Sequence, residues 1–363
     1  MRSALVALWC LVALGTDAAR ERKPASNGVS TVVPLHKCAV RYSPNVTGFI
    51  NRKGEYMTAC ALLDRPTSLS EKELLISLMA FAAGDAFGVA YEFLPEKTPV
   101  DISLIGVRKG WPRGGVSDDT LLSIITISAV TRGAPERSAA AFLAGLRQAM
   151  PELRGLGPTT RAALGMDIPA DQAALVGRTN GAMMRTSLLG LGYPPAQASE
   201  RRAMVMALAR ATHSDPAAIA CAVLCSALYS EAGEGTRRDS AGEALRREMI
   251  HLSWRPQAVD DLLGSLESWS VPEQGISLDP LDTLAAVVWV IDRAQDLADG
   301  FRLACELGGD TDTVAALAGG IIGADRRDPA ALLSIPWIDD VLWDEVPRLV
   351  DAAGVLADLR GAR

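Results

Sequence analysis

Two short acidic runs have the residue types and spacing that a metal centre requires. The first run is Ser117-Asp118-Asp119-Thr120, the second is Gly308-Gly309-Asp310-Thr311-Asp312-Thr313, and each opens an apolar, helix-like stretch. Mg²⁺ and Mn²⁺ prefer oxygen ligands, and two neighbouring divalent cations need several carboxylates to offset their charge. The two runs together therefore predict a two-metal hydrolytic centre.

Helix capping is the alternative explanation for each run. Asp, Ser and Thr are favoured helix N-caps, and acidic side chains in a first turn interact favourably with the helix dipole. A single run of this kind is more often a capping device than a metal site. Two runs, one of which begins with Gly308-Gly309, favour the metal hypothesis.

A third polar segment precedes the first acidic run and reads Gly84-Asp85-Ala86-Phe87-Gly88-Val89-Ala90-Tyr91-Glu92. Glycine weakens a helix interior, so Gly84 and Gly88 indicate a close backbone approach or a bend. Asp85 and Glu92 have apolar neighbours on both sides. This disfavours the alternative, in which they lie on the exposed face of an amphipathic helix.

The elements that must position these residues are helices. Ser70 and Glu73 form a capping-box pattern ahead of apolar residues spaced for one buried helix face. Further periodic runs predict helices near residues 119–131, 138–149, 196–211, 215–231, 240–251, 257–268, 280–297, 312–323 and 339–358. Hardly any strand pattern intervenes, so we expect one all-α, multi-helix domain over residues 68–363.

The N-terminal part differs in composition from this domain. Residues 1–19 resemble a short signal peptide, or they follow from a misassigned start codon. Residues 20–67 form a polar linker and an extension, in which residues 31–63 carry an extended or hairpin-like pattern. We favour a cytoplasmic location, and a periplasmic or secreted one if the signal-like segment is used.

The net charge and the hydropathy of the chain exclude some classes of binding partner. The net charge of −7 argues against a nucleic-acid binder, which needs a basic face. Apart from the N-terminal segment, no stretch reads as a membrane span, so no stable membrane insertion is expected. We expect a monomer.

Five motifs, in this order, resemble the ADP-ribosylglycohydrolase family. They are the Gly84–Glu92 segment, Ser117–Thr120, Arg178-Thr-Asn-Gly-Ala-Met-Met-Arg185, Ala211-Thr-His-Ser-Asp215 and Leu307–Val314, and the resemblance covers about residues 70–325. It implies an all-α orthogonal bundle with a binuclear Mg²⁺ or Mn²⁺ centre in a cleft. The implied reaction is hydrolysis of the bond between the ribose C1″ of ADP-ribose and a protein side chain.

The resemblance also implies the site residues. Metal ligands are expected from Ser117, Asp118, Asp119, Asp310, Asp312 and Thr313. Glu92 and Asp119 are the acid-base candidates, and Glu92 matches a flexible glutamate that approaches the metals or swings away. The expected substrate-binding residues are Asp85, Phe87, Asn180, Gly181, His213 and Gly309.

Some of these substrate roles have structural alternatives. Asn180-Gly181 opens a probable helix whose free N–H groups suit a diphosphate, although an ordinary turn with Asn180 as a cap explains the same pattern. His213 is expected only to line the cleft. Phe87 either contacts the ligand or packs in the core.

One departure from the family pattern concerns Gly155. The stretch Gly155-Leu-Gly157-Pro-Thr-Thr-Arg-Ala-Ala-Leu164 resembles a family element in which some members have Asp where this chain has Gly155. If that Asp is catalytic there, its loss argues against the dinitrogenase-reductase type.

Three functions follow from the sequence. The leading hypothesis is a hydrolase that removes ADP-ribose from modified proteins, with arginine favoured over serine linkages because the motifs resemble the bacterial branch. The alternative is an immunity protein that neutralises an ADP-ribosyltransferase toxin, by reversal or by occlusion through its N-terminal extension. A catalytically altered binding module is disfavoured by the intact acidic motifs.

Overall fold

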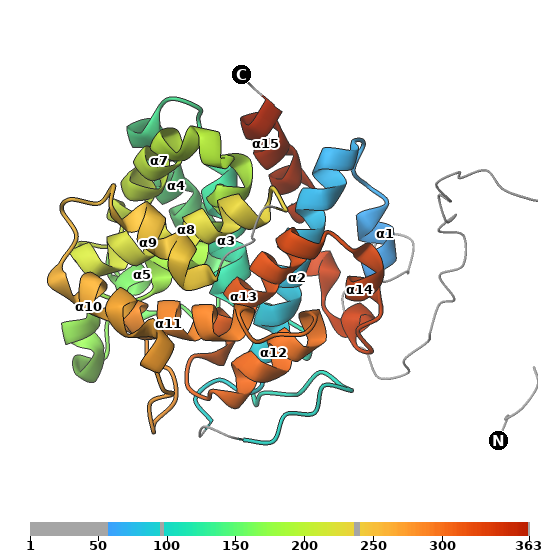
Figure 1. Ribbon diagram of the computed structural model, residues 1–363. Helices are drawn as coiled ribbons and strands as arrows, with labels where there is room; N and C mark the ends of the chain where they lie inside the picture. The colour runs from blue at the N-terminus through green and yellow to red at the C-terminus, as the bar shows by residue number, and fades with distance from the viewer. Residues whose placement is uncertain (1–56, 95–97, 236–239, 362–363) are drawn as a thin grey trace, which may run out of the picture. The chain divides into compact units, whose positions relative to one another are not determined.

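The computed structural model describes residues 57–94, 98–235 and 240–361 (Figure 1). In this part of the chain the only β-pairing is a parallel bridge between Ile276 and Gly309, so the all-α prediction is confirmed. The α-helices are α1 (Ala59–Leu63), α2 (Leu69–Gly88), α3 (Asp118–Ser128), α4 (Pro135–Ala149), α5 (Pro158–Ala163), α6 (Gly181–Thr186), α7 (Ala198–Arg210), α8 (Pro216–Ala232), α9 (Ala241–Met249), α10 (Gln257–Ser265), α11 (Pro280–Ile291), α12 (Leu297–Glu306), α13 (Thr311–Arg326), α14 (Pro329–Leu333) and α15 (Leu349–Gly361). Among the described helices, none combines the length and the apolar composition needed to cross a membrane.

Helices α2 and α13 pack against each other along their length (Figure 1). A Cβ atom on Gly84 would lie 2.2 Å from the carbonyl oxygen of Ala315, and one on Gly88 would lie 2.4 Å from the Cα of Asp312. Neither distance is possible for a real side chain, so only glycine allows this approach. The close approach predicted from Gly84 and Gly88 is therefore confirmed, and it places the end of α2 against the start of α13.

Helix α8 packs against α6, α7, α9 and α13. It is buried on nearly every face because Pro216–Ala232 consists mostly of Ala, Leu, Val, Ile and Cys. Its N-cap Asp215 accepts hydrogen bonds from the N–H groups of Ala217 and Ala218 at 2.8 and 3.2 Å. At its other end the Tyr229 hydroxyl donates to the Leu317 carbonyl of α13 at 2.8 Å, which fixes the two helices in register.

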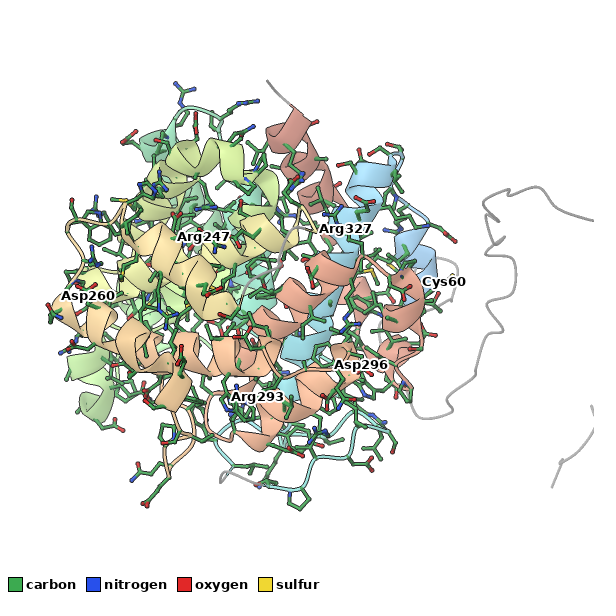
Figure 2. The ribbon with its side chains drawn as sticks, viewed as in Figure 1. Cys60, Arg247, Asp260, Arg293, Asp296 and Arg327 are labelled. Carbon is green, nitrogen blue, oxygen red and sulfur yellow. The ribbon has the colours of Figure 1, made fainter. Side chains whose placement is uncertain are left out.

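Several predicted boundaries differ from the structure. The capping box of α2 is formed by Ser68 and Glu71, two residues before the predicted pair, because the Ser68 hydroxyl accepts from Glu71 N and Glu71 accepts from Thr67 N. The helix predicted over 280–297 ends at Ile291, where α11 stops. The next helix, α12, begins only at Leu297, and its N-cap Asp296 (Figure 2) accepts a hydrogen bond from Asp299 N.

The last two corrections lie near the chain ends. The helix predicted from residue 339 begins only at Leu349, because Pro347 disfavours a helical conformation for the residue before it. The extended pattern predicted for 31–63 does not hold at its described end, where Ala59–Leu63 is α1 with Thr58 as N-cap. Residues 1–56, with the signal-like segment and most of the extension, lie outside the described residues.

An acidic segment, residues 339–345, joins the described start of the chain to two loops. Asp344 accepts from Met57 N at 3.0 Å, and Asp339 accepts from Ala59 N at 2.9 Å. In the same segment Asp340 pairs with Arg113 and Glu345 pairs with Arg154. Both arginines belong to loops that border the site described next.

Candidate active site

The two acidic runs form the first turns of α3 and α13, and both turns face one cleft. Asp118, Asp119, Asp310 and Asp312 are each at most 6% exposed, and all four line this cleft. The cleft is open to solvent and is also lined by Glu92, Thr313, Asn180 and Gly181. Runs separated by nearly two hundred residues thus meet in space, as the metal hypothesis requires.

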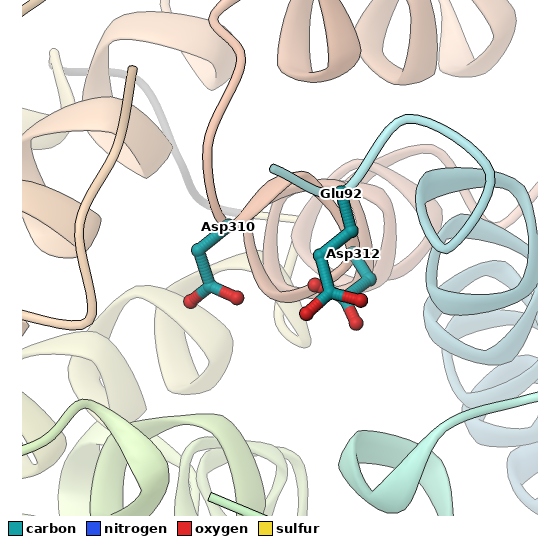
Figure 3. A group of neighbouring side chains, drawn as sticks. All are labelled: Glu92, Asp310 and Asp312. Atoms are coloured by element: carbon teal, nitrogen blue, oxygen red, sulfur yellow. The ribbon is translucent and has the colours of Figure 1, made fainter. Parts of the chain in front are cut away.

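Three carboxylates of the cleft form a compact group. Oxygens of Glu92, Asp310 and Asp312 lie within 4.8 Å of one another (Figure 3). Glu92 belongs to the turn that follows α2, whereas the two aspartates flank the first residue of α13. In Figure 3 the three side chains extend toward the same space between the helices. This is the separation at which carboxylate oxygens share one cation.

Burial and mutual repulsion both disfavour the charged form of these aspartates. Burial, followed by the nearby charges of Asp85 and Asp310, raises the pKa of Asp118 from 3.8 to about 8. Burial and the neighbouring aspartates also raise the pKa values of Asp119 and Asp312 well above the usual range. Without a compensating positive charge, the group would hold protons at neutral pH.

The same residues fit divalent cations. Among the described residues, no lysine or arginine forms an ion pair with Asp118, Asp119, Asp310 or Asp312. Asp119 Oδ2 is buried and has no hydrogen-bond partner in the described part of the chain. Unpaired buried carboxylates are costly, and an oxygen-ligated cation removes that cost.

Ser117 is the N-cap of α3 and lies behind the cleft wall. Its hydroxyl accepts a hydrogen bond from Asp119 N at 3.1 Å. The residues of this run therefore cap α3 as well as being candidates for metal binding. Thr313 does line the cleft, and its N–H donates to Asp312 Oδ1 at 2.9 Å. Capping therefore explains part of the first run, whereas Asp310, the N-cap residue of α13, makes no side-chain capping bond.

Asp85 was expected to contact the substrate, but it is completely buried beneath the cleft. Its carboxylate accepts from Ser117 N at 2.9 Å, from Thr120 N at 3.1 Å and from the Thr120 hydroxyl at 2.5 Å. Burial raises the pKa of Asp85, while these hydrogen bonds lower it. Asp85 therefore holds the first turn of α3 in place and does not line the cleft.

Phe87 is also a core residue, which corrects its expected contact with the ligand. It is fully buried, and its ring stacks on Trp337 with 4.7 Å between centroids and 10° between planes. Its ring also lies near those of Tyr91 and Phe301, and Phe87 does not line the cleft, so the core alternative holds.

Gly309 shapes the site through its backbone and does not itself line the cleft. Its φ is +75°, and a Cβ there would lie 2.0 Å from the Ile276 carbonyl oxygen. Gly309 also exchanges backbone hydrogen bonds with the turn after α2, accepting from Phe93 N at 2.6 Å and donating to Leu94 O at 3.2 Å. Only glycine fits here, and it ties the turn of Glu92 to Asp310.

Asn180 lies in the cleft wall and bonds directly to the acidic group. Its side-chain amide donates to Asp310 Oδ2 at 2.5 Å and to the Thr283 hydroxyl at 2.9 Å. It makes no side-chain capping bond to α6, so the alternative of a simple helix cap does not describe it. Asn180 orients Asp310.

His213 lies one layer below the cleft and does not line it. Its ring nitrogens contact the hydroxyls of Thr179 and Thr212 at 3.1 and 2.8 Å, and an added Cβ on Gly181 would lie 3.4 Å from the ring. Burial, and then the charge of Arg185, lowers the pKa of His213 to about 3. The imidazole is therefore neutral at physiological pH and supports the wall that carries Thr179 and Gly181.

Other cleft residues were not among the predicted site residues. They are Phe93, Gly155, Leu156, Gly157, Pro158, Thr160, Gln172, Thr179, Met184 and Leu278. The stretch from Gly155 to Thr160 carried a detectable signal because it belongs to a family-like motif. Gln172 and Leu278 lie in no motif that sequence reasoning could use.

Gly155 has a geometry that explains its lack of a side chain. Its φ is +84°, and a Cβ would lie 2.9 Å from Asp118 Oδ1 and 3.3 Å from Trp111 Cη2. An aspartate at this position would press against Asp118 and add another negative charge to it. The backbone conformation and the close contacts at Gly155 therefore explain why this chain has glycine where some family members have aspartate.

Comparisons with known proteins give a family match and a structural neighbour. A family model described as ADP-ribosylglycohydrolase matches residues 67–362. Among solved structures, the chain is similar to one described as an "ADP-ribosylglycohydrolase-related protein complex", with a TM-score of 0.61 and 25% sequence identity. That alignment covers 80% of this chain and 99% of the other. No curated protein matches the chain.

Proposed function

This chain belongs to the ADP-ribosylglycohydrolase family, and we propose that it removes ADP-ribose from modified protein side chains, preferentially from arginine, with the help of two Mg²⁺ or Mn²⁺ ions. The observation that carries the proposal is the meeting of both acidic runs and Glu92 in one cleft.

The cations belong with the two acidic runs. Asp118 and Asp119 would hold them from α3, whose first turn Ser117 caps, and Asp310, Asp312 and Thr313 would hold them from α13. When bound, the ions supply positive charge that orients the ribose hydroxyls, activates water and offsets the diphosphate. The side chains are already fixed for this purpose, because Asp85 anchors the start of α3 and Asn180 anchors Asp310.

Two carboxylates are available for proton transfer. Glycoside hydrolysis needs one group that accepts a proton from water and one that donates a proton to the leaving group. Asp119 has a free buried oxygen, and Glu92 lies at the edge of the cleft with its side chain 14% exposed. We assign the proton transfers to this pair without dividing the roles.

A direct assay tests the proposal. The protein is incubated with arginine-ADP-ribosylated and with serine-ADP-ribosylated proteins, with Mg²⁺, with Mn²⁺ or with a chelator. We expect release of ADP-ribose from the arginine substrate only when a cation is present. Asp119→Asn and Asp312→Asn should each lower the rate by about 100-fold or more, whereas Asp351→Asn, an exposed acid of α15, should not. If ADP-ribose were released from neither substrate, the hydrolase proposal would be refuted.

Toxin neutralisation remains a separate proposal, because occlusion would use the N-terminal extension. Met57 N and Ala59 N bond to the main domain, so a deletion should end at residue 56. Loss of toxin binding with hydrolysis retained would support occlusion, and equal toxin binding with and without residues 20–56 would exclude it. N-terminal sequencing of the mature chain tests the proposed cytoplasmic location, since cleavage near residue 19 would show export.

A further inference from the structure

Within the proposed metal centre, the geometry points to Arg108 as the residue that positions Glu92 for cation binding. This inference rests on the proposed function, because it concerns a residue that would ligate a cation. Nothing in the sequence motifs distinguishes Arg108, which lies in the loop between α2 and α3.

The first observation is the ion pair between Arg108 Nη1 and Glu92 Oε2. In this pair the Glu92 side chain is 14% exposed and that of Arg108 is 35% exposed. The paired Glu92 still keeps a carboxylate oxygen within 4.8 Å of oxygens from Asp310 and Asp312. A carboxylate has two oxygens with several lone pairs, so it can accept from a guanidinium and ligate a cation together.

The second observation is that Arg108 is itself held. Its guanidinium lies 5.5 Å from the centroid of the Trp111 ring, and the guanidinium of Arg154 lies 5.6 Å from the same ring. Arg154 in turn pairs with Glu345. The indole N–H of Trp111 donates to the Gly115 carbonyl at 3.0 Å, which fixes the ring. The cation–π contact with this fixed ring restrains the Arg108 guanidinium.

The third observation explains why Glu92 needs a partner. Its backbone is fixed, because the next residue, Phe93, has a φ of +59° and donates to Gly309 O at 2.6 Å. The side chain, however, has three rotatable bonds and projects from a turn. Outer-sphere partners of this kind orient the side chains that bind a metal. Arg108 fixes the carboxylate where the backbone alone does not.

Electrostatics alone predicts the opposite effect. A guanidinium beside a cation site repels the cation, so removing its charge should tighten cation binding. Removing a positioning residue should weaken binding, because Glu92 then loses its orientation. The sign of the change therefore distinguishes the two effects.

The experiment measures Mn²⁺ binding to the full chain by the electron paramagnetic resonance signal of free Mn²⁺, without any substrate. Arg108→Gln should weaken the affinity of the Glu92 site by about 10- to 100-fold, and Arg108→Lys should weaken it less. The matched control is Arg113→Gln, which removes a charge from the same loop but breaks a pair with Asp340, outside the acidic group. We expect this control to bind Mn²⁺ like the wild type.

A double-mutant comparison completes the test. Glu92→Gln should weaken Mn²⁺ binding, and adding Arg108→Gln to it should cause little further loss, because both changes remove the same interaction. Unchanged or tighter Mn²⁺ binding by Arg108→Gln, with folding verified by circular dichroism, would overturn the role of Arg108 and leave the hydrolase proposal intact. A wild type that binds no Mn²⁺ would overturn both.

Discussion

At the scale of single residues, the site depends on side chains that hold the cleft carboxylates in position. The cleft carboxylates repel one another, so their positions must be imposed by hydrogen bonds from neighbouring side chains. Asp85 does this for α3 and Asn180 does it for Asp310. Some residues of the family motifs are therefore expected to bind the cations, and others hold those residues in position.

Asp85 gives the first residue-scale prediction. Asp85→Ala leaves the N–H groups of Ser117 and Thr120 without acceptors in a dry interior, which should lower the free energy of unfolding by about 2–3 kcal/mol. The measurement is urea unfolding at saturating Mg²⁺, where the cations offset the repulsion that Asp85 would otherwise exert. Asp351→Ala, at an exposed position, serves as the control. Equal stabilities of the two variants would contradict this role.

His213 gives the second prediction. Because its pKa is lowered to about 3, the ring should stay neutral between pH 5 and 8. NMR titration of the full chain should show no shift of the His213 ring signals in this range, with His213→Gln used to assign them. A transition near pH 6.5 would mean that the ring is exposed and free to act in acid-base chemistry.

At the scale of elements, the contact between α2 and α13 sets the geometry of the site. Asp312 lies in the first turn of α13 and Glu92 follows the end of α2, so their separation depends on how closely these helices approach. Gly88 allows the approach where the two meet. The glycine contact between α2 and α13 therefore also sets the distance between the carboxylates of Glu92 and Asp312.

Gly88→Ala tests this dependence. The new methyl group would overlap Asp312 Cα and force the helices apart, which should cost about 1–3 kcal/mol of stability and weaken Mn²⁺ binding. Gly354→Ala in α15 is the matched control, since a Cβ there meets nothing within 4 Å. That change should leave Mn²⁺ binding unaltered and raise stability by up to about 1 kcal/mol. The helices would not constrain the site if Gly88→Ala bound Mn²⁺ normally.

At the scale of the whole molecule, protons and cations compete for the same buried carboxylates. The pKa of Asp118 is raised from 3.8 to about 8, so between these values the folded chain binds more protons than the unfolded chain. The stability of the cation-free protein should therefore fall as the pH rises toward 8. Divalent cations bind the ionised carboxylates, so their stabilising effect should grow over the same range.

Thermal unfolding at pH 7.0 and pH 8.0 measures this linkage. With a chelator, the midpoint temperature should be lower at pH 8.0, and the increase caused by Mg²⁺ should be larger there. Asp118→Asn should reduce the pH dependence, since it removes one of the titrating groups. The same Mg²⁺ effect at both pH values, in the wild type and in Asp118→Asn, would show that protons do not compete with the cation.

The helical class and the residue types that supply the chemistry could be predicted from the sequence. Helical periodicity is local, as are the acidic first turns at Ser117–Thr120 and Asp310–Thr313, so both can be read without the fold. Gly84 and Gly88 also predicted a close backbone approach, because glycine in a helix interior lowers stability unless another segment must pack closely against it.

Only the tertiary structure decided which polar and aromatic residues face the cleft. Asp85, Phe87 and His213 belong to the same motifs as the cleft residues, yet none of them lines the cleft, because each side chain contacts a segment distant in sequence. Gln172 and Leu278 line the cleft because the fold brings their segments to it. Arg108 pairs with Glu92 because the loop between α2 and α3 folds back toward the end of α2. Burial and contact depend on packing between segments distant in sequence, and local pattern does not encode that packing.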